Sequence, residues 1–142
     1  MASDADHLIA FQGYPGAFSR LACREAYPDL EALPCDSFED AFDAVKSGRA
    51  HLAMIPIENS LAGRVADIHT LMPDSGLFIV AEHFQRVNHC LLALPGTAVG
   101  DLKSVHSHIQ ALSQCRNLIR DLGLGAEIEA DTAGSAKDIA AR

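Results

Sequence analysis

The sequence predicts an α/β fold built on largely parallel sheets, and three observations support this prediction. Short apolar runs alternate with segments of helical periodicity along most of the chain. Glycine and proline turns separate these segments. Polar clusters follow directly after several of the apolar runs. Strands that alternate with helices are typical of βαβ units, in which neighbouring strands run parallel.

The first predicted strand and helix lie at the start of the chain. The apolar run 8–11 ends in a glycine-rich turn at 13–16, as expected for a buried strand. A helix is predicted to follow from about Ala17 to Tyr27, because Pro28 disfavours its continuation.

A second helix, a second strand and a third helix follow. Ser37, with Asp40 three residues later, is predicted to cap a helix that Gly48 closes. The apolar run 51–55 predicts a buried strand, and Pro56 ends its hydrogen-bond ladder. A third helix is predicted to end near Pro73 and Gly76. Its apolar side consists of residues at helical spacing, namely Val65, Ile68, Leu71 and Met72.

The second half contains the clearest helical pattern of the sequence. Between Ser107 and Asp121 apolar residues recur at i, i+3 and i+4, and Ser107 with Gln110 forms a capping-box pattern. The other expected elements of this half are strands at 77–80, 89–94 and 127–130 and a helix that begins at Gly134.

Composition and charge exclude several classes of protein. Hydrophobic residues make up 49% of the 142 residues, which is ordinary for a globular core. The net charge of −8 argues against a nucleic-acid-binding surface, and no apolar run is long enough to span a membrane. The acidic start lacks the basic and apolar stretches of a secretion signal, so we expect none, and the four cysteines form no CxxC pair. We therefore expect a cytoplasmic protein with reduced, mostly buried thiols.

Four polar clusters follow predicted strands or open predicted helices. In open α/β sheets ligands bind beyond the carboxyl ends of the strands, and helix N-termini there attract anions. Each cluster also has an ordinary structural explanation as a turn, a helix cap or a solvated carboxylate. Together they favour a polar, anion-binding cleft. The clusters are residues 13–19, 58–60, 107–108 and 131–135.

Metal, dinucleotide and serine-hydrolase signatures are absent from the sequence. His106 and His108, and the stretch from His83 to His89, contain the closest histidine pairs, but no HExxH motif accompanies them. The glycine turn lacks the GxGxxG pattern, and no GxSxG motif occurs. The residues therefore favour neither a metal site nor a dinucleotide site.

Five segments, taken in order, resemble prephenate dehydratase across nearly the whole chain. Residues 56–60 match the family's PIENS motif residue for residue, and residues 108–115 match its HPQALxQC segment except at Ile109. The other three segments are similar to the family's first glycine loop, to the stretch before its second helix and to a Ser/Thr-rich segment, and they are residues 13–19, 35–39 and 132–136.

The resemblance implies the decarboxylating dehydration of prephenate to phenylpyruvate, in phenylalanine biosynthesis. It also implies a two-lobed fold like that of type II periplasmic binding proteins, with the site in the cleft and no cofactor. We expect lobe 1 at residues 1–76 and an incomplete lobe 2 at residues 77–142. A homodimer is expected for the full-length protein, with no membrane or nucleic-acid partner.

The motif matches also imply roles for individual residues. Catalytic roles are expected for Glu58, Asn59 and Gln114, with Glu58 either orienting its neighbours or transferring a proton. Further hydrogen bonds to the substrate are expected from four hydroxyl residues, which are Ser19, Ser60, Ser107 and Thr132.

Departures from the family pattern leave alternatives open. Ala17 replaces a hydroxyl residue that is common in the first loop. The family's Thr-Arg-Phe segment and its regulatory ACT domain have no match in the 142 residues, so we expect a C-terminally truncated chain with little or no activity alone. Arogenate dehydratase and a non-catalytic module that binds small anions are the alternatives. A Thr-Arg-Phe motif further along the intact gene would favour an enzyme over the binding module.

Overall fold

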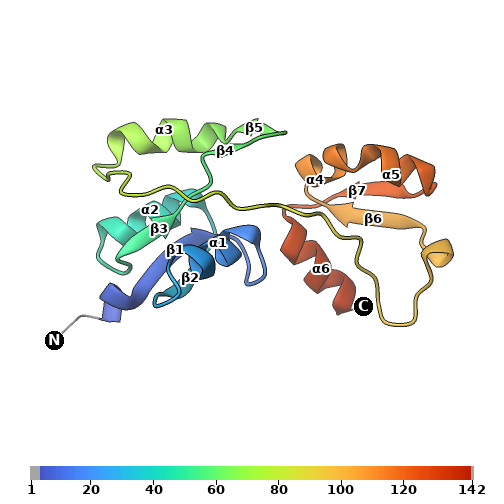
Figure 1. Ribbon diagram of the computed structural model, residues 1–142, viewed down its shortest axis with the longest axis horizontal. Helices are drawn as coiled ribbons and strands as arrows, with labels where there is room; N and C mark the ends of the chain where they lie inside the picture. Colours follow the sequence, from blue (N-terminus) through green and yellow to red (C-terminus); the bar gives the residue numbers. More distant parts are fainter. Residues whose placement is uncertain (1–3, 142) are drawn as a thin grey trace. The chain divides into compact units, whose positions relative to one another are not determined.

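The computed structural model describes residues 4–141 and consists of two compact units (Figure 1). Unit 1 is Met1–Arg86 and unit 2 is Val87–Arg142. The sequence-based boundary between lobes was placed after residue 76, and residues 77–86, which contain no helix or strand, belong to unit 1 by their contacts.

Unit 1 is built on a three-stranded parallel sheet. Its strands are β1 (Leu8–Gln12), β2 (Glu31–Cys35) and β3 (Leu52–Met54), in the order β2-β1-β3. Both neighbours pair with β1 in parallel. This arrangement confirms the predicted α/β class with a parallel sheet.

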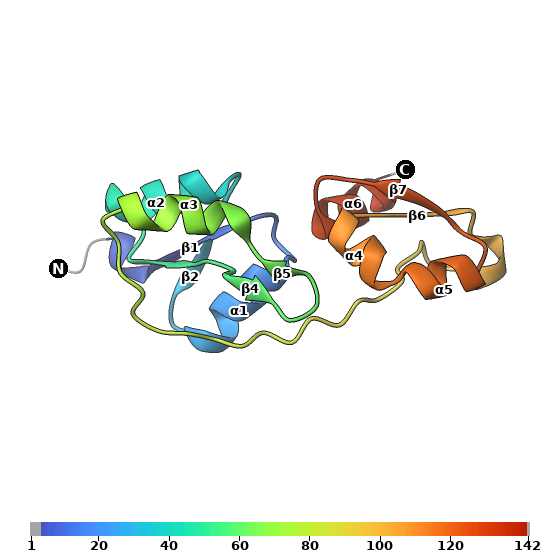
Figure 2. The same cartoon turned by 90° about the horizontal axis from the view of Figure 1, so that it is seen from above.

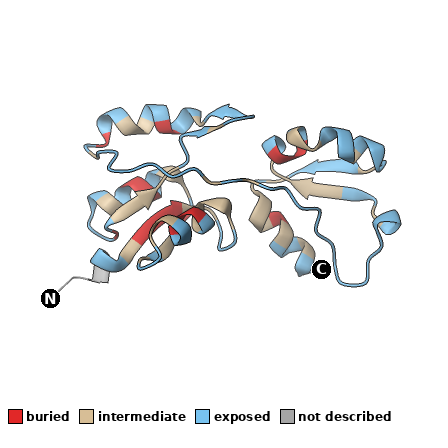
Figure 3. Ribbon diagram, viewed as in Figure 1, coloured by how far each residue is buried: buried red, intermediate tan, exposed pale blue. Residues whose placement is uncertain are grey.

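Two helices cover opposite faces of this sheet. Because side chains alternate along a strand, Ala10 points to one face of β1 while Ile9 and Phe11 point to the other. Ala10 packs with buried alanines of α2 (Phe38–Lys46), whereas Ile9 and Phe11 pack with Cys23 of α1 (Phe18–Ala26). The two helices lie on either side of the sheet in Figure 2. The buried residues concentrate along β1 and the inner sides of these helices (Figure 3).

The helix starts in unit 1 follow the sequence-based expectations. The Ser37 hydroxyl accepts a hydrogen bond from the Asp40 backbone N–H at 3.1 Å and donates one to the Asp40 carboxylate at 2.9 Å. Gly48 follows α2 with φ 73°, a left-handed conformation that glycine adopts without strain. A short 3₁₀ helix, η1 (Asp4–His7), precedes β1.

A small antiparallel hairpin and a third helix complete unit 1. The hairpin consists of β4 (Glu58–Asn59) and β5 (Gly63–Arg64), and α3 (Ala66–Asp74) follows it. The third helix was predicted, and Pro73 lies in its last turn. The hairpin was not predicted, because two-residue strands are too short to show a period.

Unit 2 contains a two-stranded parallel sheet with three helices. Strands β6 (Ser104–Ser107) and β7 (Gly125–Ile128) pair in parallel. Helix α4 packs against both strands and α6 packs against β6. The helices are α4 (Ile109–Gln114), α5 (Arg116–Asp121) and α6 (Thr132–Ala140), and a 3₁₀ turn, η2 (Val99–Asp101), precedes β6.

Several predicted elements are corrected by the structure. The apolar runs 77–80 and 89–94 are not strands, since a strand requires a hydrogen-bonded neighbour and none of the described residues pairs with them. Most of their side chains are exposed, including Phe78 at 87%. The predicted helix 107–121 is broken at Cys115 into α4 and α5. His108, not Ser107, caps α4 through its imidazole nitrogen.

The strand β2 was missed by the sequence analysis because Pro34 interrupts its pattern. Proline cannot donate to a ladder, so it is tolerated mainly in edge strands. β2 lies at an edge of the three-stranded sheet, which explains why Pro34 is compatible with it.

Candidate functional site

The first loop of unit 1 leads into a helix N-terminus that no side chain caps. Gly13 and Gly16 have φ values of 114° and 117°, so the turn after β1 needs residues that accept a left-handed backbone. Ala17 is the N-cap of α1 and makes no side-chain capping bond. Ser19, a predicted substrate-binding residue, is the second residue of α1. The N-terminus of α1, where Ser19 lies, therefore has no side-chain cap, which favours an anion there.

The second loop places three predicted site residues on a tight turn. The Asn59 side-chain oxygen accepts hydrogen bonds from the backbone N–H groups of Leu61 and Ala62, both at 2.9 Å. Its amide nitrogen makes no hydrogen bond to another described residue and remains available as a donor. Glu58 and Ser60, on either side, are exposed. Because β1 and β3 are parallel, this turn and the Ser19 loop follow carboxyl ends at the same edge of the sheet.

The hairpin adds a residue that the sequence analysis missed. Arg64 of β5 lies directly across from Glu58 of β4 in the antiparallel register. Opposite charges in such a cross-strand position attract each other. The sequence signal for this pairing was the polar turn with Gly63, whose φ of 84° is typical of a tight turn.

In unit 2 two predicted residues gather at the carboxyl edge of the β6–β7 sheet. Ser107 ends β6 and its carbonyl accepts a hydrogen bond from the Glu129 backbone N–H at 3.0 Å. Thr132 opens α6 just after β7. The Asp131 carboxylate caps this helix by accepting from the Gly134 N–H at 2.6 Å. The Asp131 carboxylate thus already occupies part of the N-terminus of α6. Fewer backbone N–H groups remain there for an external anion.

Gln114 is oriented by a histidine that the sequence analysis considered only as a metal ligand. The side-chain oxygen of Gln114 lies 3.0 Å from His89 Nε2. When Nε2 carries the proton it donates to this oxygen, and the Gln114 amide nitrogen is then left to donate elsewhere. His89 is 25 residues away in the chain, so no local pattern could have revealed this contact.

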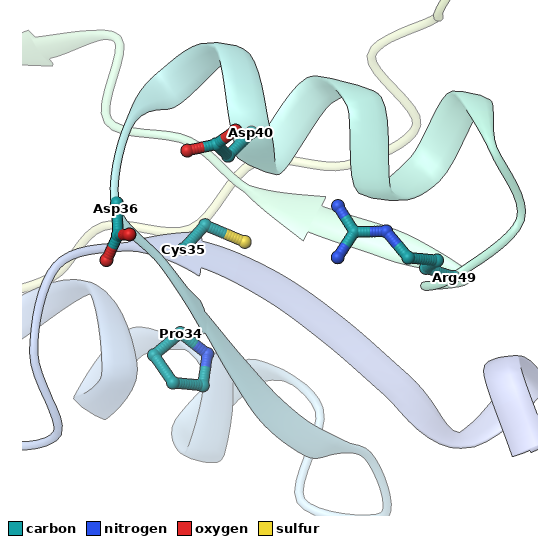
Figure 4. Close-up of a pocket in the computed structure, with 5 residues that line it drawn as sticks. All are labelled: Pro34, Cys35, Asp36, Asp40 and Arg49. Atoms are coloured by element: carbon teal, nitrogen blue, oxygen red, sulfur yellow. The ribbon is translucent and has the colours of Figure 1, made fainter.

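A pocket in unit 1 is lined by none of the predicted site residues. It has a volume of about 240 Å³ and is lined by residues of β2, the turn after β2, α2 and the loop after α2, as Figure 4 shows, namely Pro34, Cys35, Asp36, Asp40 and Arg49. Burial raises the pKa of the Cys35 thiol above its usual value, although the nearby Arg49 guanidinium acts in the opposite direction. A thiol held in its neutral form is a poor nucleophile, so this pocket offers no activated cysteine.

The described residues offer no cluster of metal ligands. Within residues 4–141 no group of three or more His, Cys, Asp or Glu side chains could hold a metal ion. In the same part of the chain no helix combines the length and the apolar character that a bilayer span requires.

The structure divides the predicted site between the two units. Ser19, Glu58, Asn59 and Ser60 belong to unit 1, whereas Ser107, Gln114 and Thr132 belong to unit 2. In each unit the residues are mostly neutral hydrogen-bonding groups near strand ends and helix starts. Such groups can bind carboxylates without a strong cationic charge.

Comparison with known proteins identifies the family. The family model described as "PDT: Prephenate dehydratase" matches residues 9–142. The chain is 54% identical over 134 residues to a bifunctional N-acyl-homoserine lactone acylase/prephenate dehydratase of Komagataeibacter europaeus, covering 94% of this chain and 48% of that protein. It is 47% identical over 132 residues to the chloroplastic arogenate dehydratase/prephenate dehydratase 2 of Arabidopsis thaliana, covering 93% of this chain and 35% of that protein.

A solved structure agrees with these sequence matches. The prephenate dehydratase of Arthrobacter aurescens in complex with L-Phe superposes with a TM-score of 0.74 at 25% identity, covering 94% of this chain and 46% of that chain. The chain spans about half or less of the length of these relatives. The family match, which extends over nearly all described residues, shows that the chain belongs to the prephenate dehydratase family.

Proposed function

We propose that this chain contributes substrate-binding and catalytic residues to a prephenate dehydratase, which converts prephenate to phenylpyruvate, carbon dioxide and water. The observation that carries this proposal is the Asn59 turn. There, an asparagine whose oxygen is fixed by two backbone N–H groups keeps its amide nitrogen free to donate. The family match over residues 9–142 supports the proposal.

The reaction suits a site of neutral donors. Loss of carbon dioxide and of the ring hydroxyl creates an aromatic ring, and the stability of this ring makes the reaction favourable. The enzyme has to hold a dicarboxylate in a reactive geometry and assist departure of the hydroxyl. A strong cationic clamp on the departing carboxylate would stabilise the substrate more than the transition state. Amide and hydroxyl donors avoid that penalty.

Each predicted residue receives a role in this proposal. Hydrogen bonds to the substrate come from four side chains, namely those of Asn59, Ser60, Ser107 and Gln114. His89 orients Gln114 through the contact at 3.0 Å. Ser19 acts together with the uncapped N-terminus of α1. Thr132 contacts the substrate from the start of α6. Glu58, across from Arg64, orients its neighbours or transfers a proton.

Arogenate is the alternative substrate, since it differs from prephenate by an amino group in place of a keto group. The Arabidopsis thaliana relative is named for both activities. A homodimer and a cytoplasmic location for the natural protein are further predictions of this proposal.

The test measures product formation from each substrate by the protein at its natural length. Prephenate should give phenylpyruvate, and Ser60→Ala should reduce kcat/KM about tenfold or more, because a hydrogen bond to a charged group contributes about 1.5–3 kcal/mol. Ser113→Ala is the matched control, since Ser113 is exposed and has no predicted role. A higher kcat/KM for arogenate would change the substrate, and turnover of neither substrate would reject the proposed function.

A second candidate function is hydrolysis of the amide bond in N-acyl-homoserine lactones. The relative from Komagataeibacter europaeus, at 54% identity, is named as an N-acyl-homoserine lactone acylase as well as a prephenate dehydratase. Release of the free amine from an N-acyl-homoserine lactone tests this candidate independently of prephenate turnover. Absence of amine release by the folded protein would reject it.

A further inference from the structure

Three side chains of unit 2 form a hydrogen-bonded line that the dehydratase proposal does not use. Ser104 Oγ lies 3.1 Å from His106 Nε2, and His106 Nδ1 lies 3.1 Å from Glu129 Oε1. The two nitrogens of one imidazole ring therefore contact a hydroxyl on one side and a carboxylate on the other. This is the order of groups in a serine–histidine–acid relay.

The strand ladder explains why these groups meet. Ser104 and His106 are two residues apart on β6, so their side chains point to the same face. Glu129 directly follows β7, the parallel neighbour of β6. Its backbone N–H donates to the Ser107 carbonyl at 3.0 Å, which holds the Glu129 carboxylate beside the ring.

The contacts indicate which ring nitrogen carries the proton. An ionised carboxylate accepts hydrogen bonds and cannot donate them, so His106 Nδ1 is the donor to Glu129. In the neutral ring Nε2 is then unprotonated and accepts the hydrogen of the Ser104 hydroxyl. A ring held in this tautomer is ready to act as a general base toward Ser104.

Exposure also fits a reactive hydroxyl. Ser104 is exposed, whereas the His106 side chain is only 18% exposed and that of Glu129 is 40% exposed. A ligand can therefore reach the hydroxyl while most of the base is covered. The Ser104–His106 hydrogen bond joins two residues of one strand, so it contributes nothing to holding β6 and β7 together.

We propose that Ser104, His106 and Glu129 form an acyl-transfer centre that accepts acyl groups from esters or amides. This proposal rests on the second candidate function stated above and names the residues that would carry it. Ser104 is the nucleophile, His106 is the general base, and Glu129 is a positioning residue that acts through His106. The centre lies within unit 2 and shares no residue with the predicted prephenate site.

The chemistry balances with water as the only co-reactant. Ser104 Oγ forms a bond to the acyl carbon while its proton moves to His106 Nε2. The tetrahedral adduct then breaks its bond to the leaving alcohol or amine, which takes the proton from His106. Water attacks the resulting acyl-serine, with His106 again accepting a proton and returning it to Ser104. The sum is ester or amide plus water giving a carboxylic acid plus an alcohol or amine.

The direct test is covalent labelling of the folded protein with a fluorophosphonate probe and hydrolysis of a short-chain p-nitrophenyl ester. Mass spectrometry should find the phosphonyl group on Ser104, and Ser104→Ala should lose the label. His106→Gln should lower the labelling and hydrolysis rates about 10²–10⁴-fold, which is the range that general-base assistance contributes. Ser113→Ala, at an exposed serine of α4, is the matched control and should label normally.

The role of Glu129 needs a readout that a purely structural contact would not change. Glu129→Gln should slow labelling of Ser104 at least about tenfold while leaving the thermal unfolding midpoint nearly unchanged, because the ring is no longer held in the right tautomer. Glu129→Asp should recover part of the rate. Equal loss of rate and of thermal stability in Glu129→Gln would indicate a structural role instead.

The outcomes separate this centre from the function on which it rests. A folded wild-type protein that leaves Ser104 unlabelled, or a Ser104→Ala variant with the wild-type ester hydrolysis rate, overturns the proposal. If Ser104→Ala still releases the amine from an N-acyl-homoserine lactone, the acylase function stands and this centre is rejected. If Ser104 is labelled and the ester is hydrolysed but no amine is released from an N-acyl-homoserine lactone, the centre stands as an ester-directed site. The acylase candidate then fails.

Discussion

The side-chain oxygen of Asn59 accepts a hydrogen bond from the backbone N–H of Leu61 at 2.9 Å, and this contact shapes the turn that the proposed dehydratase site depends on. A second acceptor contact to Ala62 has the same length. Asn59 thus has two separable functions, since its oxygen builds the turn while its nitrogen is free to contact a substrate. Any test of Asn59 has to distinguish the two.

Gly63→Ala should destabilise this turn. Gly63 has φ 84°, and an alanine there meets no steric clash with other atoms but has to adopt a left-handed backbone, at a cost of about 1–2 kcal/mol. Urea denaturation measures the loss of unfolding free energy. Gly100→Ala is the control, because Gly100 also has open space around it and no positive φ. Equal effects of the two substitutions would contradict the geometry of the turn.

Ser37→Ala should remove the cap of α2. The Ser37 hydroxyl accepts from the Asp40 N–H and donates to the Asp40 carboxylate, so its loss should reduce the unfolding free energy by about 1 kcal/mol. Denaturant unfolding followed by circular dichroism gives the value. Ser113→Ala, inside α4 and without a capping role, should produce little change or a small gain. A stability loss at Ser113 as large as that at Ser37 would argue against the cap.

Phe11→Ala should be the most damaging single truncation in unit 1. Phe11 is fully buried in one core cluster with Ile9 and Cys23, and deleting a buried phenylalanine side chain costs about 3–5 kcal/mol. Thermal unfolding checks this. Phe78→Ala provides the contrast, since Phe78 is 87% exposed and its loss should change the unfolding free energy by less than about 0.5 kcal/mol. Similar losses at both positions would place Phe78 in a core.

The four cysteines should react with a thiol reagent in a defined order. All four are free thiols; Cys90 is exposed, while Cys23 and Cys35 are buried. Burial raises the pKa of Cys23 to about 11, so at neutral pH its reactive thiolate is scarce as well as inaccessible. Native labelling followed by mass spectrometry should modify Cys90 first and Cys23 last, and denaturant should expose all four. Rapid native labelling of Cys23 would contradict its burial on the inner side of α1.

The sequence allowed prediction of elements that local chemistry determines. The apolar run ending at Gly13 became β1, and Ser37 capped its helix through Asp40, because both depend on neighbours a few residues away. β2 escaped prediction because the edge position that makes Pro34 acceptable is a property of the sheet. The break at Cys115 had no local signal, since neither glycine nor proline occurs there.

The candidate site shows the same division between local and tertiary information. The polar run 58–60 could be recognised from its residues alone. The contacts from Gln114 to His89 and from His106 to Glu129 span 25 and 23 positions, and only folding reveals them. The runs 77–80 and 89–94 favour strands in the sequence because a short apolar run indicates burial in a sheet, whereas the described residues supply no partner strand.

The most direct test of the proposed function compares Asn59→Asp with Asn59→Ala in the prephenate assay, at the natural length of the protein. Aspartate keeps the acceptor that builds the turn but replaces the donor with a charge that repels a dicarboxylate. Asn59→Asp should therefore retain the wild-type unfolding midpoint and lose about 100-fold or more in kcat/KM, whereas Asn59→Ala should lose both activity and some stability. An Asn59→Asp enzyme that forms phenylpyruvate at the wild-type rate would contradict the assignment of Asn59 to the site.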